Sequence, residues 1–221
     1  MLQDKVVVVT GANGALGRVA VELAASQGAA VVALDLRFDG TPGARRYTLD
    51  LSDAAGTVAC VAGLGRVDVL FNIAGGFAMG PSVHETTFEQ WDHMTRMNVT
   101  TTRNMINAVV PGMLARGRGS IVNVGALSAR EGQANMGAYC VAKSTVMRLT
   151  ESLSKELRGK GINVNAVLPS IIDTPTNRGD MPDADFSRWV APSDLAAVMC
   201  FLGSDAARAI HGALLPVAGL A

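Results

Sequence analysis

The chain has few cysteines, few histidines and no formal net charge. Its three cysteines, Cys60, Cys140 and Cys200, are dispersed and form no Cys-x-x-Cys pair. We therefore expect buried, reduced thiols and no disulfide framework. The three histidines are equally scattered, so the sequence predicts no metal site. The 19 basic and 19 acidic residues cancel, which gives no electrostatic reason to expect nucleic acid or an anionic membrane as a partner.

Long apolar runs are also missing. No uncharged apolar segment approaches the roughly 18 residues of a membrane span, and the four valines after Lys5 are too few for the core of a signal peptide. We therefore expect a cytoplasmic protein. The chain does have 221 residues, 49% of them hydrophobic, and 24 glycines. This length and composition suit one α/β domain with a single core.

Apolar runs typical of buried strands alternate with stretches of helical periodicity. Successive βα units imply parallel strands, because right-handed crossovers place the intervening helices on the faces of the sheet. We find no internal repeat and no linker. The sequence predicts strands at 5–10, 29–35, 67–75, 119–126, 162–169 and 212–219, and helices at 15–27, 53–64, 86–116, 137–158 and 193–203.

A glycine-rich turn joins the first strand to the first helix in "VVVVTGANGALGRVAVELAASQG". Glycines at 11, 14 and 17 let the backbone approach a diphosphate, and the helix N-terminus offers free N–H groups and the positive end of its dipole. A strand before the turn and an amphipathic helix after it strengthen this interpretation. The expected fold is one Rossmann-type doubly wound α/β domain over residues 1–221, with a mostly parallel seven-stranded sheet covered on both faces.

The second predicted strand ends at Asp35, eighteen residues after Gly17. A carboxylate at this place accepts hydrogen bonds from the ribose hydroxyls of NAD and repels the 2′-phosphate of NADP. The glycine turn before Gly17 contains no Arg or Lys, and Arg37 lies two positions beyond the carboxylate. The sequence therefore predicts that NAD(H) is preferred over NADP(H).

Tyr139 and Lys143 are spaced i, i+4 in a helical segment, so they share one helix face. A neighbouring ammonium would lower the phenol pKa from its ordinary value near 10. The pair could then act as general acid in a reduction and as general base in an oxidation. Thirteen residues before the tyrosine, where a polar side chain often helps to polarise the substrate, the chain has Ala126.

Several motifs occur in one order along the chain: "TGANGALG", "FNIAG" at 71–75, "MNV" at 97–99, "YCVAK" at 139–143 and "VLPSIIDT" at 167–174. Together with the tail "SDAARAIHGALLPVAG" they resemble the short-chain dehydrogenase/reductase family over nearly the whole chain. The resemblance implies an NAD(P)H-dependent oxidoreductase acting on a small molecule. Members commonly form homodimers or homotetramers, so we expect one of these.

The resemblance also implies a role for each matching residue. Lys143 would bind the nicotinamide ribose, and Asn98 would hold a water that relays protons to Lys143. With Tyr139 these make the predicted catalytic set. The cofactor contacts would be Gly11, Gly14 and Gly17 at the diphosphate, Asp35, Asn72, Ala74 and Gly75 at the adenosine ribose, Asp50 and Leu51 at adenine, and Ile172 and Thr174 at the carboxamide. Asn13, Ala15 and Leu16 of the glycine turn are further candidate cofactor contacts.

The chain departs from the family pattern at three positions. Ordinary members have glycine in place of Ala15 and of Ser170, and a polarising serine in place of Ala126. Losing one donor of this kind costs on the order of 10²–10³ in rate in other enzymes. Ser128, two residues further on, is a possible substitute donor, with an exposed loop serine as the alternative.

A narrower resemblance accounts for the alanine. "DTPTNRGDMPDADFSRW" (173–189), "NGALG" (13–17) and "IAGGFA" (73–78) resemble the dihydropteridine reductases, which reduce a quinonoid dihydropterin with NADH and also have alanine at this place. A quinonoid pterin is already electrophilic, so it needs less polarisation than a ketone. Asn98 and "GKGINVNAV" instead resemble the 3-oxoacyl reductases, so a carbonyl or alcohol substrate stays open. A third alternative is an NAD(H)-binding sensor or interaction protein without turnover.

The segment 170–192 has no strong periodicity, and loops of this length are usually functional or disordered. We expect a mobile substrate lid that closes aromatic surface over a flat substrate; the alternative is that its aromatic residues pack into the core. Asn177 and Arg178 could approach a polar ring edge. The candidate substrate contacts are Ala126, Phe77, Met181, Phe186 and Trp189.

Overall fold

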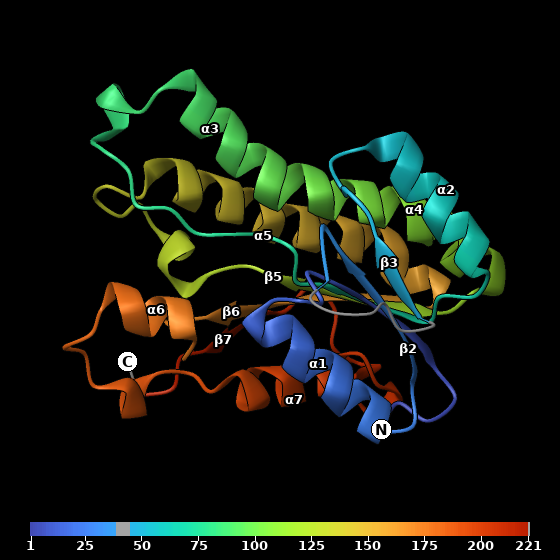
Figure 1. Cartoon of the computed structure of the whole chain (residues 1–221). Helices are drawn as coiled ribbons and strands as arrows, with labels where there is room; N and C mark the ends of the chain where they lie inside the picture. The colour runs from blue at the N-terminus through green and yellow to red at the C-terminus, as the bar shows by residue number, and fades with distance from the viewer. Residues whose placement is uncertain (39–44, 221) are drawn as a thin grey trace.

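A computed structural model describes residues 1–38 and 45–220. Its centre is a seven-stranded sheet in the order β3-β2-β1-β4-β5-β6-β7 (Figure 1). Every neighbouring pair is parallel, so the predicted "mostly parallel" sheet is parallel throughout this order. The strands are β1 (Val6–Thr10), β2 (Ala30–Asp35), β3 (Arg46–Thr48), β4 (Val69–Asn72), β5 (Gly119–Val124), β6 (Ile162–Pro169) and β7 (Leu214–Val217).

Helices cover both faces of the sheet, as predicted (Figure 1). The helices α1 and α7 pack together on one face, and α2, α4 and α5 lie on the other. Each layer encloses its own apolar cluster against the strands. The helices are α1 (Ala15–Ser26), α2 (Ala54–Leu64), α3 (Phe88–Thr95), α4 (Thr101–Arg116), α5 (Gly137–Leu157), α6 (Pro175–Asp180) and α7 (Pro192–Leu202). Among the described residues, no helix is long and apolar enough to cross a membrane.

The helix predicted over 86–116 is present from Phe88 to Arg116, and a π-helical turn lies within it. The structure has α3, a π-helical turn η2 (Arg96–Thr100) and then α4. A capping box of Thr87 and Gln90 starts α3. Within η2, the buried Asn98 donates its side-chain amide to the Met94 carbonyl at 3.1 Å and so competes with the regular backbone ladder. Wide turns of this kind are frequent at functional sites.

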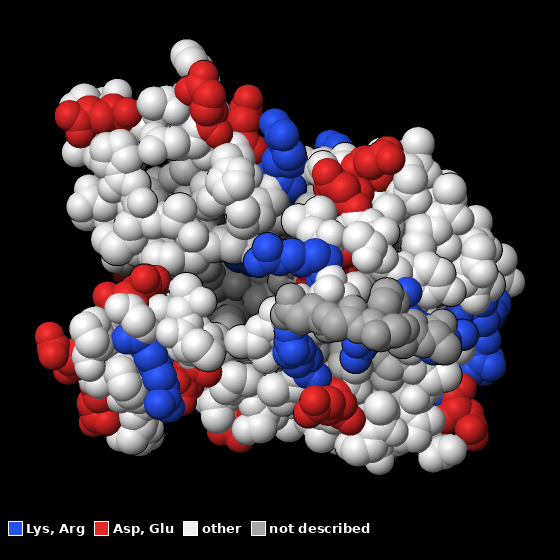
Figure 2. Space-filling view, viewed as in Figure 1, with Lys and Arg blue, Asp and Glu red and all other residues white. Residues whose placement is uncertain are grey.

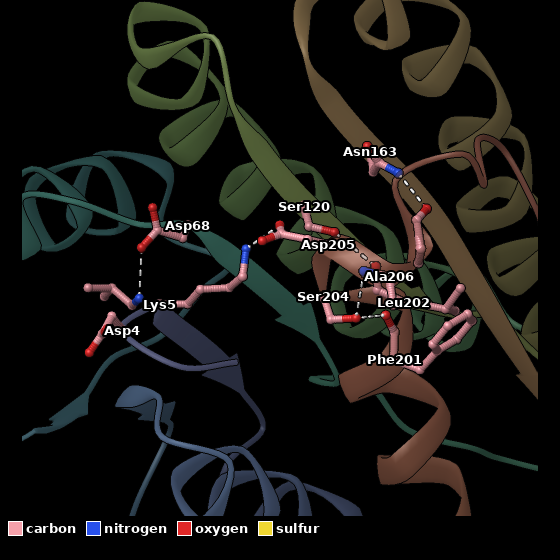
Figure 3. Close-up of polar contacts among 12 residues, drawn as sticks. Asp4, Lys5, Asp68, Ser120, Asn163, Phe201, Leu202, Ser204, Asp205 and Ala206 are labelled. Carbon is pink, nitrogen blue, oxygen red and sulfur yellow. Dashed lines mark hydrogen bonds and ion pairs between the residues drawn. The ribbon is translucent and has the colours of Figure 1, made fainter. Parts of the chain in front are cut away.

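Polar contacts tie the amino-terminal ends of the strands to one another and to the segment after α7 (Figure 3). Asp68 accepts the Val6 N–H at 2.8 Å, and Lys5 pairs with Asp205 at 2.6 Å. Ser120 donates to the Leu202 carbonyl at 3.1 Å, and Asn163 donates to the Ala207 carbonyl at 2.9 Å. We call Lys5, Asp68, Ser120, Asn163 and Asp205 the amino-edge clasp.

The predicted lid contains more regular structure than its sequence suggested. It includes α6 and the short 3-10 turn η5 (Phe186–Arg188), and a parallel bridge between Ile172 and Val190 closes its base. The end of the chain is tied to it, because Leu220 N–H donates to the Arg188 carbonyl at 2.9 Å.

Candidate active site

The glycine turn after β1 is pressed against the segment that follows β4. Gly11 has φ +63°, and a Cβ added there would lie 2.9 Å from Ala74 Cα. The Thr10 hydroxyl accepts the Ile73 and Ala74 N–H groups at 3.0 Å each. This hydroxyl was not among the predicted site residues, although its place at the end of a strand before glycine is a usable signal. The carboxyl ends of β1 and β4 therefore form one surface.

The start of α1 suits a dinucleotide diphosphate. A Cβ on Gly17 would lie 2.0 Å from the Gly11 carbonyl oxygen, so only glycine lets the helix begin this close to the turn. The N-cap residue Gly14 makes no side-chain cap, which leaves the first N–H groups of the helix to a ligand. Leu16 is buried in the core, so only its backbone can contribute to the predicted contact.

Asp35 is placed beside this turn, as predicted. Its carboxylate accepts the Asn13 N–H at 2.8 Å and the Arg37 N–H at 3.3 Å. Sequence analysis missed Arg18, which donates to the Asn13 carbonyl at 2.8 Å and to the Asn13 side chain at 2.7 Å. A cation therefore lies close to the acidic end of β2, and its signal was the arginine directly after the last glycine.

Two of the predicted adenosine contacts have side chains that point into the protein. Leu51 belongs to the apolar core, and Asn72 is buried and donates to the Asn123 side chain at 2.9 Å. A contact of either residue with the cofactor would therefore involve its backbone, and both contacts stay predictions. Asp50 is exposed and accepts the Ser52 N–H at 2.8 Å, a bond that lowers the pKa of its carboxyl.

Lys143 and Gly75 meet at the carboxyl edge of the sheet. The Lys143 ammonium group is buried and donates to the Val124 carbonyl, at the end of β5, at 2.9 Å. A Cβ on Gly75 would lie 3.2 Å from Lys143 Nζ and 2.6 Å from Asn98 Oδ1. The strip 74–76 thus touches the glycine turn on one side and Lys143 on the other.

The Asn98 side chain is fully engaged in positioning this strip. Its Oδ1 accepts the Gly76 N–H and its Nδ2 donates to the Gly76 carbonyl, both at 3.1 Å. It is 1% exposed. The Asn98 backbone carbonyl accepts the Thr102 hydroxyl at 2.8 Å, and a carbonyl oxygen can accept a second hydrogen bond. That Asn98 holds a relay water stays a prediction.

The predicted lowering of the Tyr139 pKa is wrong for the protein by itself. Burial raises the pKa of Tyr139 to about 12, with a smaller contribution from Cys140. Burial also lowers the pKa of Lys143 to about 8. The physical reason is that burial disfavours the charged form of both groups. At neutral pH the Tyr139 phenol is therefore protonated.

The surroundings of Tyr139 are apolar and aromatic. The Phe77 ring meets the Tyr139 ring edge-on, with centroids 5.0 Å apart, and Phe77 is 52% exposed. Ala126 is buried in a cluster that packs against Tyr139. Ser128 is half-buried, and its carbonyl accepts the Cys140 thiol at 3.7 Å. That Ser128 replaces the missing serine stays a prediction.

Most polar contacts of the lid residues are with other residues of the lid. The Thr174 hydroxyl caps α6, and Asn177 donates to the Ile172 carbonyl at 2.7 Å. Arg178 pairs with Asp173 and lies 4.7 Å from the centre of the Phe186 ring. Asn177 and Arg178 are thus engaged in the lid's own structure.

The aromatic residues of the lid differ in exposure. Phe186 packs on Trp189 with ring centroids 4.8 Å apart, and Trp189 is 8% exposed. Trp189 is therefore packed inside the protein, whereas Met181 stays accessible at the end of α6. Ser170, which replaces the usual glycine, donates to the Ala218 carbonyl at 2.7 Å.

The surface above the carboxyl edge is hollowed between α6 and the α3–α5 layer (Figure 2). The glycine turn, Asp35, the strip 74–76, Phe77 and the Tyr139–Lys143 pair all belong to this side of the sheet. Ligands of open α/β sheets bind outside the carboxyl ends of the strands, where the strand order reverses. Here the order reverses between β1 and β4.

This arrangement is compatible with binding of a dinucleotide, and comparison with known proteins gives the family. Residues 5–185 match the family model described as short chain dehydrogenase. The chain belongs to the short chain dehydrogenase family and is an oxidoreductase of it. Among curated relatives, it is 33% identical to D-threitol dehydrogenase of Mycolicibacterium smegmatis, over 99% of this chain and 93% of that protein. It is 30% identical to 3-oxoacyl-[acyl-carrier-protein] reductase of Thermotoga maritima, over 99% and 98%.

Solved structures agree with this fold. A protein of Beutenbergia cavernae, titled a putative NAD(P)-dependent gluconate 5-dehydrogenase with NADP bound at low occupancy, is 31% identical with a TM-score of 0.90, over 99% of this chain and 96% of that one. Carveol dehydrogenase of Mycobacterium avium, in complex with NAD, is 27% identical with a TM-score of 0.87, over 99% and 97%. Proteins similar to this chain thus bind NAD or NADP.

Proposed function

We propose that this protein is an NAD(H)-dependent reductase in which Tyr139 donates a proton to a small substrate while the nicotinamide supplies the hydride. The observation that carries the proposal is the strip 74–76. It touches Gly11 of the cofactor turn and, through Gly75, Lys143 of the catalytic pair. Hydride donor and proton donor would then meet over the same edge of the sheet. The protonated Tyr139 phenol can act as the general acid of such a reduction.

We propose NADH as the preferred cofactor. Asp35 supports this preference, because its carboxylate lies at the end of β2 beside the glycine turn. Arg18 argues against a preference for NADH. Its guanidinium donates to the Asn13 side chain, and the Asn13 N–H binds the Asp35 carboxylate, so a cation lies near that carboxylate. The ratio of kcat/KM for NADH and NADPH decides between them. We expect NADH to be favoured, and Asp35→Asn to reduce that ratio.

The substrate that suits the site best is a quinonoid dihydropteridine. Two features support it: the buried Ala126 in the place of a polarising hydroxyl, and the aromatic edge of Phe77 on Tyr139. A conjugated, electrophilic ring needs little polarisation and could lie against such a wall. The reaction would add one hydride and one proton to the ring and yield the tetrahydropterin.

A second candidate is a carbonyl or secondary-alcohol substrate. The names of the two curated relatives, a D-threitol dehydrogenase and a 3-oxoacyl-[acyl-carrier-protein] reductase, favour it. An NAD(H)-binding protein without turnover is the third, and its support is again Ala126. The Tyr139–Lys143 pair speaks against it.

An NADH-consumption assay with quinonoid dihydropterin beside a panel of ketones separates these candidates. We expect the pterin to be reduced fastest. If a ketone is reduced faster than the pterin, the second candidate function is favoured. If the protein binds NADH but reduces none of the acceptors, the third is favoured. The variant Ala126→Ser adds a matched test. A large increase in kcat/KM for ketones, with no increase for the pterin, would indicate that the alanine suits a conjugated substrate.

We further propose a homodimer or homotetramer. Val83, Phe88 and Val141 leave apolar side chains 58%, 86% and 54% exposed on the outer helical layer. Sedimentation equilibrium gives the oligomeric state directly, and a monomer would reject the proposal.

A further inference from the structure

The segment that follows β7 is bound to both ends of the lid. Ser170, which opens the lid, donates its N–H to the Val217 carbonyl at 3.1 Å and its hydroxyl to the Ala218 carbonyl at 2.7 Å. Leu220 is bound twice to Arg188, near the other end of the lid. Its N–H donates to the Arg188 carbonyl at 2.9 Å, and its carbonyl accepts the Arg188 guanidinium at 2.5 Å. This segment therefore joins the two ends of the lid.

Gly219 lies where the segment after β7 approaches the lid most closely. It has φ +62°, a backbone conformation that most side chains avoid. A Cβ added there would lie 2.8 Å from the Arg188 carbonyl oxygen, so there is also no room for a methyl group. Glycine at this position lets the two backbones meet.

The end of the lid in turn fixes the backbone that follows β6. Val190 donates its N–H to the Ile171 carbonyl at 2.9 Å and accepts the Asp173 N–H at 2.8 Å. These two partners flank Ile172, so the backbone groups of Ile172 itself point away from Val190. The Ile172 carbonyl accepts the Asn177 amide at 2.7 Å. Among the residues that the structure describes, no group accepts the Ile172 N–H.

Two hydrogen-bond donors thus follow the carboxyl end of β6. The Ile172 N–H is one, and such groups inside a protein normally have a partner. The Thr174 hydroxyl is the other, because its oxygen accepts the Asn177 N–H at 3.1 Å and its proton can donate elsewhere. Ile172 also packs against the apolar cluster that includes Ala12 and Leu16 of the glycine turn. The acceptor oxygen of a nicotinamide carboxamide would suit these donors.

We propose that Ser170 and Gly219 are positioning residues for the nicotinamide end of the cofactor. By binding the lid to the segment after β7, they hold Ile172 and Thr174 where the carboxamide needs them. The inference rests on the proposed function, which brings a nicotinamide to this edge of the sheet. It gives Ser170, where ordinary family members have glycine, a bond that glycine cannot make. Both residues act through the lid backbone, so their loss should affect the nicotinamide half of the cofactor and spare the adenosine half.

Two substitutions weaken this contact, and each has a matched control. Ser170→Ala removes the hydroxyl, and Ser120→Ala removes a similar bond from a serine to a carbonyl at the amino edge. Gly219→Ala forces a methyl group onto the Arg188 carbonyl. Gly117→Ala makes a similar demand on the backbone, because φ is +65° there, but its methyl group would meet nothing within 4 Å.

The experiment measures the dissociation constants of NADH and of ADP-ribose by isothermal titration calorimetry. ADP-ribose keeps the adenosine, the diphosphate and the second ribose of NADH and lacks the nicotinamide. We expect the wild type to bind NADH more tightly than ADP-ribose. Ser170→Ala should weaken NADH binding about two- to tenfold, the range for one lost hydrogen bond, and Gly219→Ala at least as much. ADP-ribose binding should not change, and both controls should bind as the wild type does.

Each outcome decides one claim. Unchanged NADH binding in either folded variant would remove that residue from the positioning role. An equal loss for NADH and ADP-ribose would overturn the role and show a general structural effect instead. If Gly219→Ala does not fold, Ser170→Ala decides alone.

The same measurements separate this inference from the proposed function. A wild type that binds NADH and reduces no acceptor would reject the reductase, while the binding comparison would still test the positioning role. A wild type that binds neither ligand, or both with equal affinity, would reject the positioning of a nicotinamide.

Discussion

The two edges of the sheet contrast in what their polar groups do. At the amino edge, the clasp pairs donors and acceptors that start the strands, as in the bond from Val6 to Asp68. At the carboxyl edge, glycines replace side chains, and groups such as Lys143 are buried although burial opposes their charge. The contacts at the amino edge join elements of the fold, whereas the carboxyl edge holds the candidate active site. Changes at the two edges should therefore affect different measurements.

The largest expected effect is at the carboxyl edge. In Gly75→Ala the new methyl group would overlap Asn98 Oδ1 and crowd Lys143 Nζ. We expect kcat/KM to fall on the order of 100-fold, because displacements of about 1 Å at a catalytic site cost this much. The control is Gly63→Ala in α2, where the methyl group meets nothing within 4 Å. Equal activity of the two variants would remove Gly75 from the site.

The next effect is a pH dependence of stability at Lys143. The folded pKa of about 8 lies below the ordinary value of 10.5, so between these values the unfolded chain binds a proton that the folded protein does not. Stability of the wild type should therefore rise, relative to Lys143→Met, as the pH increases from 8 to 10.5. The change should be at most about 3 kcal/mol.

Urea unfolding at a series of pH values measures this difference. The control is Lys155→Met, which removes an exposed lysine from the same helix. A stability difference between wild type and Lys143→Met that stays constant from pH 7 to 10.5 would show that the Lys143 pKa is not lowered.

At the amino edge, Asp68→Ala should destabilise the protein and leave kcat/KM unchanged. The substitution leaves the Val6 N–H without its acceptor and removes the partner of Arg66. We expect a loss of about 1–3 kcal/mol in the free energy of unfolding. Asp68→Asn, which keeps an acceptor oxygen, should lose less. A lower kcat/KM of folded Asp68→Ala would contradict the separation of roles between the two edges.

The smallest effect belongs to the exposed part of the same clasp. Asp205 is 88% exposed where it pairs with Lys5, and exposed ion pairs contribute roughly 0–1 kcal/mol. Asp205→Ala should therefore shift the urea midpoint little, and the remaining shift should shrink in high salt. A loss as large as that of Asp68→Ala would mean that the ion pair stabilises the clasp more than exposure allows.

Much of the fold could be predicted because buried strands carry continuous apolar runs and the glycine turn has a strict spacing. The strand β3 has neither signal: Arg46–Thr48 are all exposed, and only its register beside β2 defines it. The thiols were predicted correctly as free, although Cys60 is only partly buried. Local pattern thus locates the buried elements and misses an exposed one.

The site was harder to predict, since direction and environment depend on the folded chain. Asn72 and Leu51 occupy the expected places, but their side chains point inward. The spacing of Tyr139 and Lys143 predicted one helix face, whereas the pKa of each depends on burial, which the spacing does not contain. Asn98 was selected as a candidate by its motif, and its side-chain amide oxygen accepts the Gly76 N–H.

The claim on which the account depends is that the Tyr139 phenol delivers the proton that accompanies the hydride. Single-turnover oxidation of prebound NADH by a saturating acceptor tests it most directly, in wild type and in Tyr139→Phe, which keeps the ring against Phe77. We predict that the variant binds NADH with unchanged affinity and loses a factor on the order of 10²–10⁴ in the rate of that turnover. Equal single-turnover rates in the two proteins would contradict the account.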